Sequence, residues 1–287
     1  MKPTLIKYVL ACTLLLAGMA YPTLPAKAQP QAGKKRLLII AGTPSHKAGE
    51  HEYNAGALLL QQWLAKSPDL AVSVSLNGWP ADTTLVSNAD GIVLFMDGKD
   101  GHLALKPAYK RQLLKAASRG AGLAALHYAV TLPAGNGDPL LDLLGGFKED
   151  KYSVHGFWTS DFRTIPVHPV TQGVKPFQVY DECYFFLRFR PQVNPILSAT
   201  PPDSLRNTPA SRNFSGRPET IAWVYERPDG GRSFGNTALH FHQNWANDDL
   251  RKLVLNALRW ICRLDVPPGG VVSTVSPEDL QKNLDKK

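Results

Sequence analysis

The sequence KKRLLIIAG at residues 34–42 contains a continuous apolar run that ends at Gly42, which is typical of a buried β-strand. The next stretch, EYNAGALLLQQWLAKSP at residues 52–68, repeats its apolar residues about every 3.6 positions, as an amphipathic helix does. A buried strand followed by such a helix indicates the first unit of an α/β fold.

The same alternation continues along the first half of the chain. Apolar strand patterns recur in LAVSVSL, GIVLFMDG and AGLAALHYA, at residues 70–76, 91–98 and 121–129. A helix between the last two begins at Pro107 and ends at Gly120. Strands separated by helices favour a mostly parallel sheet covered on both faces. We therefore predict a doubly wound α/β fold.

The second half is less regular before the pattern returns. Residues 133–215 are rich in glycine, proline and aromatic residues, and 200–219 is typical of a surface loop. Later strands are expected at residues 177–189, 194–199, 220–226 and 233–241, followed by a helix with one apolar face up to Ile261. Residues 269–287 are expected to form a loosely held tail, in which SPEDLQKNL can form a short helix.

The first 28 residues resemble an export signal. Lys2 and Lys7 precede an apolar run, and Ala26-Lys27-Ala28 supplies a small-x-small cleavage site. We predict a periplasmic or secreted protein with no membrane span after cleavage, a single α/β domain at residues 29–268 and a tail at 269–287.

The charges and cysteines of the processed chain limit its function. Removal of three lysines leaves 29 basic and 24 acidic residues, a scattered excess of +5 that argues against a nucleic-acid partner. The remaining thiols, Cys183 and Cys262, are too few for a disulfide framework and are expected to be small buried residues, although pairing remains open.

Five candidate residues follow strands of the predicted sheet. Ligands in open α/β sheets bind beyond the carboxyl ends of the strands. His46 follows the first strand, Asp97 and His127 end later ones, and His240 and His242 end the last. We expect all five at one edge of the sheet. Asp97 is a candidate substrate contact, although MDG is also typical of a turn.

The stretch TALHFHQNWANDD at residues 237–249 carries the strongest candidates. Residues two apart on a strand share a face, so His240 and His242 are expected to point the same way, about 7 Å apart. Together with His127 they can bind a divalent metal ion, or act as a ligand and a base. The alternative is a pair of imidazoles bonded to backbone, one of them packed under the final helix.

Two further segments contribute candidates. In GTPSHKAGEHE at residues 42–52, His46 is favoured over His51 because it belongs to the loop, whereas Glu50 and Glu52 are interpreted as acids at a helix N-terminus. In YDECYFF, Asp181 and Glu182 should face opposite sides of a strand, so that only one points inward.

The inward acid of that pair would be desolvated among aromatic rings. Desolvation raises the pKa of a carboxyl group, which suits a general acid or base. The alternative is a salt bridge with Arg188 or Arg190.

Two tryptophans and an amide are candidate substrate contacts. Trp158 and Trp245 are expected in loops, where a flat aromatic face suits a sugar ring, although such residues also fill local apolar clusters. Asn244 can hydrogen-bond to the same ligand. The chain has neither a glycine-rich phosphate loop nor a G-x-S-x-G motif, which excludes a nucleotide cofactor and serine-hydrolase chemistry as leading interpretations.

Six segments in register resemble the trehalose-utilisation (ThuA-like) family over about residues 36–268. They are AGTPSHKAGEHEYNAG, GAGLAALHYAV, LLGGF, HPVTQGVKPF, DECYFFLRF and GGRSFGNTALHFHQNWANDDLRKLVLNALRW. The resemblance implies a flavodoxin-like, mostly parallel sheet with helices on both faces, related to class I glutamine amidotransferases. It also implies a link to carbohydrate metabolism.

The resemblance to amidotransferases lacks their nucleophile. His127 stands at the strand-to-helix elbow where those enzymes carry a cysteine. FHQN matches their F-H-P-E stretch, with His242 in the histidine position and Asn244 in place of the glutamate. Cysteine-dependent glutaminase chemistry is therefore not expected. Cys183 also replaces a tryptophan of the ThuA-like pattern.

Two functional hypotheses follow. The first is an enzyme acting on a sugar or an oxidised keto sugar through acid–base or metal-assisted chemistry. Its candidate catalytic residues are His46, His127, Asp181, Glu182, His240 and His242. The second is a non-catalytic carbohydrate-binding or partner protein that retains an amidotransferase-like scaffold.

Overall fold

The computed structural model describes residues 33–135 and 138–287. The predicted export signal at residues 1–28 lies outside the described residues. Among the residues that are described, no helix combines the length and apolar character needed to cross a membrane.

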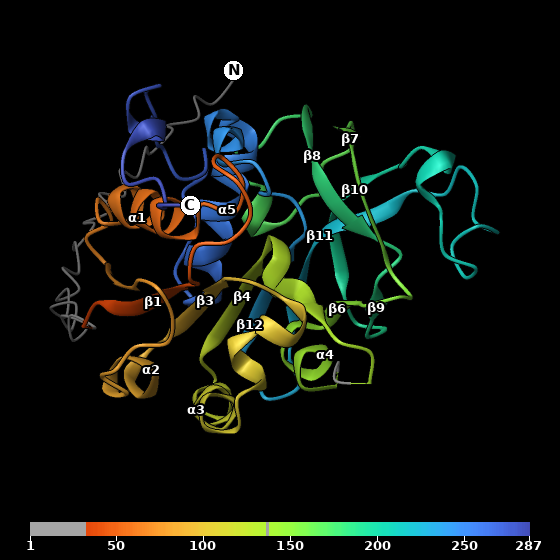
Figure 1. Ribbon diagram of the computed structural model, residues 1–287. Coiled ribbons are helices and arrows are strands. Elements are labelled where there is room, and N and C mark those ends of the chain that lie inside the picture. Colours follow the sequence, from red (N-terminus) through yellow and green to blue (C-terminus); the bar gives the residue numbers. More distant parts are fainter. Residues whose placement is uncertain (1–32, 136–137) are drawn as a thin grey trace, which may run out of the picture. The chain divides into compact units, whose positions relative to one another are not determined.

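A seven-stranded sheet forms the centre of the described chain (Figure 1). Its strand order is β10-β11-β12-β4-β3-β1-β2, and β2, β1, β3, β4 and β12 run parallel. The parallel strands are β1 (Lys35–Ala41), β2 (Leu70–Ser75), β3 (Gly91–Phe95), β4 (Gly122–Leu126) and β12 (Arg232–Asn236). The antiparallel strands at one edge are β10 (Asn194–Ala199) and β11 (Glu219–Glu226). The predicted mostly parallel α/β sheet is confirmed.

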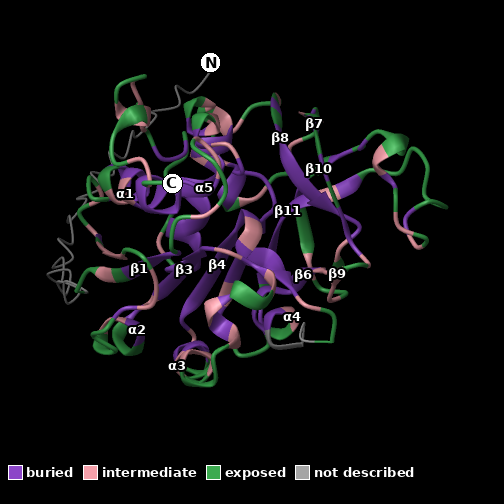
Figure 2. Ribbon diagram, in the orientation of Figure 1, coloured by how far each residue is buried: buried purple, intermediate pink, exposed green. Residues whose placement is uncertain are grey.

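Helices cover both faces of this sheet (Figure 1). Helices α1 (Tyr53–Leu64) and α5 (Asp248–Ile261) lie on one face, and α2 (Thr84–Asn88), α3 (Pro107–Ser118) and α4 (Asp138–Leu144) lie on the other. Successive residues of a strand point to opposite faces. Accordingly, Leu37 and Ile39 belong to one buried cluster, and Leu38 and Ile40 belong to the other. Figure 2 shows the central strands buried between the two helical layers.

The irregular middle of the chain forms two small sheets beside the main one. Strands β5 (Thr131–Leu132), β6 (Gly146–Glu149) and β9 (Arg188–Phe189) form one, and β7 (Val154–Phe162) pairs antiparallel with β8 (Phe177–Phe185) in the other. Short 3-10 turns are η1 (Lys99–Gly101), η2 (Leu103–Leu105), η3 (His127–Val130), η4 (Pro169–Thr171), η5 (Asp203–Leu205), η6 (His242–Ala246) and η7 (Asp279–Gln281).

The last parallel strand ends earlier than expected. It stops at Asn236, and residues 237–241 leave the sheet through Leu239, whose φ of 89° lies in the left-handed region. The expectation of a strand through Phe241 is therefore wrong, with consequences for both histidines of the HFH motif.

The C-terminal segment is packed rather than loose. The indole of Trp63 donates to the Thr274 carbonyl at 2.9 Å, and the Asp285 amide donates to the Glu52 carboxylate at 2.6 Å. The ammonium of Lys287 lies 3.5 Å from the same carboxylate. The expected loosely held tail is therefore wrong: it contacts both ends of α1. Cys183 and Cys262 are buried and free, as small apolar residues would be.

Candidate functional site

Four side chains from distant segments converge beyond the carboxyl ends of the parallel strands. We call them the histidine–glutamate cluster: His51, His127, Glu182 and His240, all buried. The Nε2 atom of His51 lies 3.0 Å from Nε2 of His127 and 3.0 Å from Nδ1 of His240. The latter two atoms are 3.3 Å apart. The Oε2 atom of Glu182 lies 3.5 Å from His127 and 3.3 Å from His240.

The backbone turns sharply at the cluster. His51 has φ 47° and His127 has φ 51°, and Leu239, directly before His240, has φ 89°. Non-glycine residues seldom adopt this left-handed region, and such strained positions concentrate at functional sites. The three turns direct side chains from separate loops toward one point.

The tautomer of His127 is fixed by its surroundings. Its Nδ1 lies 2.7 Å from the Thr237 carbonyl oxygen, which can only accept, so Nδ1 carries the hydrogen. Burial lowers the pKa of His127 well below its usual value, and the neighbouring His51 lowers it further. The ring is therefore neutral, and its Nε2 presents a lone pair to the cluster.

A hydroxyl and a carboxylate orient His51. The Tyr53 hydroxyl donates to Asp97 at 2.8 Å, so its oxygen is free to accept from Nδ1 of His51, also at 2.8 Å. Ser45 donates to the same Asp97 carboxylate at 2.7 Å. Burial lowers the pKa of His51. Its Nε2 lone pair therefore also faces the cluster, and Asp97 acts behind His51.

Asp181 holds the loop that carries His240. Its buried carboxylate accepts hydrogen bonds from the backbone amides of Leu239, His240 and Phe241, at 2.7, 3.1 and 3.3 Å. Burial raises the pKa of Asp181 to about 6. This raised pKa is the one expected of a desolvated acid, and the same carboxylate also anchors the backbone of residues 239–241.

Glu182 points to the opposite side of β8 and enters the cluster. Burial would raise its pKa, but the adjacent imidazoles of His240 and His127 lower it to about 2. The predicted opposite orientation of the two acids is confirmed, but the expectation that only one points inward is wrong, because both sides of β8 are covered here. The alternative salt bridges are also wrong: Arg188 pairs with Glu149, and Arg190 pairs with Asp142.

The cluster has the dimensions of a metal-binding site. Ligand atoms 2.0–2.1 Å from a tetrahedral zinc ion lie roughly 3.3 Å from one another. The contacts given above span 3.0–3.5 Å. Two of the imidazole nitrogens present lone pairs, and Glu182 is an anion. These four residues can therefore hold a divalent cation, whereas the expected set of His127, His240 and His242 does not meet.

His242 lies apart from the cluster. It begins η6, and neither ring nitrogen has a hydrogen-bond partner among the described residues. Burial lowers the pKa of His242 to about 4. The expectation that His240 and His242 share a face is wrong, because the strand has already ended and the backbone turns between them.

The aromatic and amide candidates also lie outside the histidine–glutamate cluster. Trp158 lies in β7 rather than a loop and packs against Phe185, and Trp245 packs against Trp63. Both indoles are buried in an apolar cluster, as in the alternative that the sequence left open. The Asn244 side chain donates to the Tyr180 carbonyl at 2.9 Å, outside the cluster.

A small pocket opens onto the cluster. Its volume is about 120 Å³, below the roughly 300–1,000 Å³ typical of ligand sites, so it accommodates the reacting part of a ligand. It is lined by His46, His51, Lys99, Tyr128, Lys148, His155, Glu182 and Tyr184. The exposed His46 ring lies 3.7 Å from that of His51, centroid to centroid, and is thus placed at the pocket as expected.

Lys148 is the unpaired charge of this pocket. It is 3% exposed, and its ammonium lies 5.2 Å from the Tyr184 ring centroid. Within residues 33–135 and 138–287 it has no hydrogen bond or ion pair. Burial lowers the pKa of Lys148. A buried charge without an ion pair is costly, which favours a functional role over a structural one.

Sequence reasoning missed several of these residues. His51 stands in the same loop as His46 at the end of a strand, so its position carries the same signal. Tyr128 directly follows the candidate His127, so its position carried a signal. Lys148 and His155 lie in the irregular middle of the chain, where no periodic pattern indicated their orientation.

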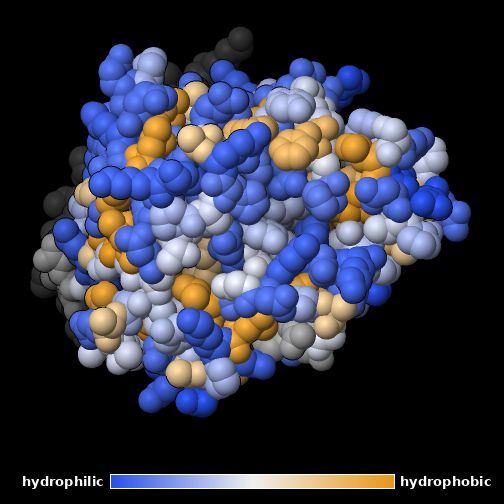
Figure 3. Space-filling model, in the orientation of Figure 1, coloured by the Kyte–Doolittle hydropathy of each residue, from blue (hydrophilic) through white to orange (hydrophobic). Residues whose placement is uncertain are grey.

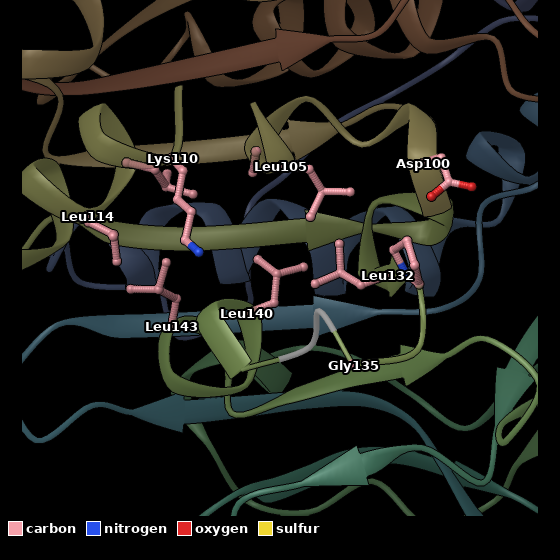
Figure 4. A pocket seen from close by; sticks show the side chains of 11 residues that line it. Asp100, Leu105, Lys110, Leu114, Leu132, Gly135, Leu140 and Leu143 are labelled. Atoms are coloured by element: carbon pink, nitrogen blue, oxygen red, sulfur yellow. The ribbon is translucent and has the colours of Figure 1, made fainter. Parts of the chain in front are cut away.

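A larger cavity elsewhere lacks such chemistry. It has a volume of about 430 Å³ and is lined largely by leucines from α3, α4 and adjacent segments, with Asp100 and Lys110. Figure 4 shows Leu105, Leu140 and Leu143 around it. No histidine lines it. The histidine–glutamate cluster is therefore the better candidate for a reactive site.

The fold and the cluster define an α/β protein with a candidate active site at the carboxyl edge of its parallel strands. The chain belongs to the ThuA family, described as trehalose utilisation, which matches residues 36–261. The resemblance noted in the sequence is thereby confirmed. No curated protein matches the chain.

Two solved structures share the fold. A ThuA-like protein from Bacteroides uniformis is 15% identical, with a TM-score of 0.58 over 84% of this chain and 95% of that chain. A ThuA-like protein from Parabacteroides merdae is 18% identical, with a TM-score of 0.58 over 85% of this chain and 94% of that one. The family supports a carbohydrate-related role.

Proposed function

We propose that the protein is an enzyme acting on a sugar or an oxidised keto sugar through metal-assisted acid–base chemistry. The observation that carries the proposal is the approach of three imidazole nitrogens within 3.0–3.3 Å of one another beside an anionic carboxylate. The Nε2 atoms of His51 and His127 both present lone pairs to this point, and a cation between them would be bound by both. The family description supports the sugar as substrate.

The proposed ligands of a divalent ion are His51, His127, Glu182 and His240. When bound, such an ion would polarise a carbonyl oxygen and stabilise the negative charge that develops on it. Asp97, through Tyr53, keeps His51 in the tautomer that ligation requires, as groups behind metal ligands commonly do.

Lys148 is the proposed proton carrier. It lines the same pocket as Glu182, and burial lowers its pKa, which favours the neutral amine. A neutral amine there can take a proton from the carbon next to a substrate carbonyl and return it later. This assignment replaces the expected acid–base roles of Asp181 and His242.

We also propose a flavodoxin-like winding of the sheet. The parallel strands have the order β2-β1-β3-β4-β12, which supports a distant relation to class I amidotransferases. The elbow after β4 holds His127, and both free cysteines are buried elsewhere, so we propose no thiol-based chemistry. The proposed location is periplasmic or secreted, on the strength of the export signal predicted at residues 1–28.

Metal content and turnover together test the proposal. Purified wild-type protein should contain close to one divalent ion per chain after dialysis, and should convert a keto sugar. Glu182→Gln removes one charge with almost no change in shape and should lose both properties. The matched control is Glu226→Gln, at an exposed position at the end of β11, which should retain both.

Three results would contradict the enzyme proposal. They are wild-type protein that takes up no ion from zinc, manganese or magnesium solutions, Glu182→Gln protein that retains metal and activity, and sugar binding without metal or turnover. The last result would favour the alternative, a carbohydrate-binding protein without catalysis. The absence of a thiol at the elbow supports that alternative.

A further inference from the structure

One face of the β7–β8 ribbon leads from the cluster to the protein surface. Side chains alternate along each strand, so Tyr180, Glu182 and Tyr184 of β8 share a face. In the antiparallel register, Phe157 of β7 stands directly opposite Glu182, and His155 opposite Tyr184. Directly opposed side chains are close neighbours. The face that supplies Glu182 to the cluster therefore continues into Phe157 and Tyr180.

Three aromatic rings gather on this face, and we call them the aromatic platform: Phe157, Tyr180 and Phe241. Phe157 is 45% exposed and Tyr180 is 54% exposed. The rings of Tyr180 and Phe241 are nearly parallel, with centroids 6.0 Å apart, and Phe157 lies 5.8 Å from Phe241. The Phe157 ring is also 5.2 Å from that of His240. The platform thus touches the cluster.

The rings of the platform lie together on the surface, unlike the other exposed apolar residues. The other exposed large apolar residues of the described chain come from separate segments: Leu76, Leu114, Val167, Phe214 and Val272. Figure 3 shows apolar surface beside the ends of β7 and β8. An exposed apolar cluster rimmed by polar groups marks a binding site more often than a scattered residue does. Here the polar rim includes His155, Thr159 and Gln178, all exposed.

The size of the pocket explains why a ligand must extend onto the platform. At about 120 Å³ the pocket accepts only the reacting part of a ligand, so the remainder must leave it. His155, which lines the pocket, and Phe157 are on the same face of β7, so one exit leads over the platform. Flat aromatic rings bind the C–H faces of sugar rings, while polar neighbours bind the hydroxyl groups at their edges.

We propose that the aromatic platform is a subsite for the second ring of a two-ring substrate, such as a disaccharide or glycoside, whose reacting ring enters the pocket. This inference rests on the proposed function, because it names the substrate class of the same site. The aromatic rings contact the ring that is not transformed, and therefore contribute to affinity and selectivity rather than to proton transfer.

The test compares binding of two-ring and one-ring sugars. Trehalose and cellobiose, with glucose as the one-ring probe, are titrated into wild-type protein, Phe157→Ala, Tyr180→Ala and the double variant, with binding followed by saturation-transfer NMR and calorimetry. Each single substitution should weaken disaccharide binding roughly three- to tenfold, and the double more, while glucose binding is unchanged. The matched control is Phe214→Ala, an exposed aromatic of the 200–219 segment, which should bind as wild type.

Several outcomes would overturn the subsite. They are wild-type protein that binds neither disaccharide, a double variant that binds disaccharides as wild type does, and equal losses for glucose and disaccharides. A wild-type oligomer that dissociates when the platform is removed, seen by light scattering, would instead assign the platform to a second copy of the chain. Circular dichroism checks that the variants fold, which their exposure favours.

Binding needs no turnover, so the two proposals can fail separately. Platform-dependent disaccharide binding without metal or activity would support the subsite proposal and contradict the enzyme proposal. Turnover with the same KM for two-ring substrates in wild type and double variant would leave the enzyme and remove the subsite.

Discussion

His240 and His242 stand two residues apart in one short motif, yet they have opposite environments. They are 3% and 5% exposed, so burial does not distinguish them. His240 lies within 3.3 Å of His51, His127 and Glu182, whereas both nitrogens of His242 lack a hydrogen-bond partner among the described residues. The position of the backbone, rather than the sequence motif, therefore determines which of the two histidines can act as a metal ligand.

Asp181 is the physical cause of the difference. Its carboxylate binds the amides of residues 239–241 from 58 to 60 positions earlier in the sequence. This contact holds His240 toward the cluster, and η6 then begins at His242, whose ring lies nearer the charges of Glu52 and Lys287.

The largest expected effect separates the two histidines directly. His240→Ala should remove about a quarter of the binding energy of a four-ligand site, and weaken zinc binding by about a hundred- to a thousandfold. His242→Ala should bind zinc as wild type does. Competition with a chelator measures both. Equal losses in the two variants would show that His242 takes part in the site after all.

The second prediction removes the cause of the difference. Asp181→Ala leaves the three buried amides of Glu182, Leu239 and His240 without this acceptor, at about 1–3 kcal/mol each, so the free energy of unfolding should fall by at least about 3 kcal/mol. Zinc affinity should fall as well, because His240 is no longer held. Urea unfolding measures stability, and Asp161→Ala, at a half-buried position on the neighbouring strand β7, is the control. A stable variant with normal zinc affinity would refute the anchoring role.

The third prediction concerns the acid sensitivity of His242. Its pKa is about 4 in the folded chain against an ordinary 6.5, so the unfolded chain binds the proton first as pH falls. Stability is therefore lost between pH 6.5 and pH 4, by up to about 3 kcal/mol. His242→Leu should remove this loss and, by eliminating two unpartnered nitrogens, gain about 1 kcal/mol at pH 7.

Urea unfolding of wild type and His242→Leu at pH 7 and pH 4.5 provides the measurement. The difference in the free energy of unfolding between the two proteins should be larger at pH 4.5 than at pH 7. A constant difference would mean that His242 gains a proton equally well in both states, contrary to its unpartnered burial.

The sequence was most informative where a local pattern and the sheet geometry coincide. Apolar strands ending in polar residues predicted the parallel sheet and placed His46, Asp97, His127 and His240 at one edge. It failed where a long-range contact overrides the local pattern. No local pattern near residue 240 indicates that the distant Asp181 binds the backbone there, where the strand has already ended. Likewise, no local pattern near Trp158 or Trp245 distinguishes an indole in the core from one that contacts a ligand.

The wide spacing of the cluster along the chain has a consequence for assembly. His51 and His240 are 189 positions apart, and a cation shared by them would close a loop of that size, as a cross-link does. Synthesis must pass His240, the last of the four donors in the sequence, before all four exist together. An incompletely synthesised chain would therefore have no reactive site. Release of the ion from the full-length chain would remove the cross-link between these loops and destabilise that edge of the sheet.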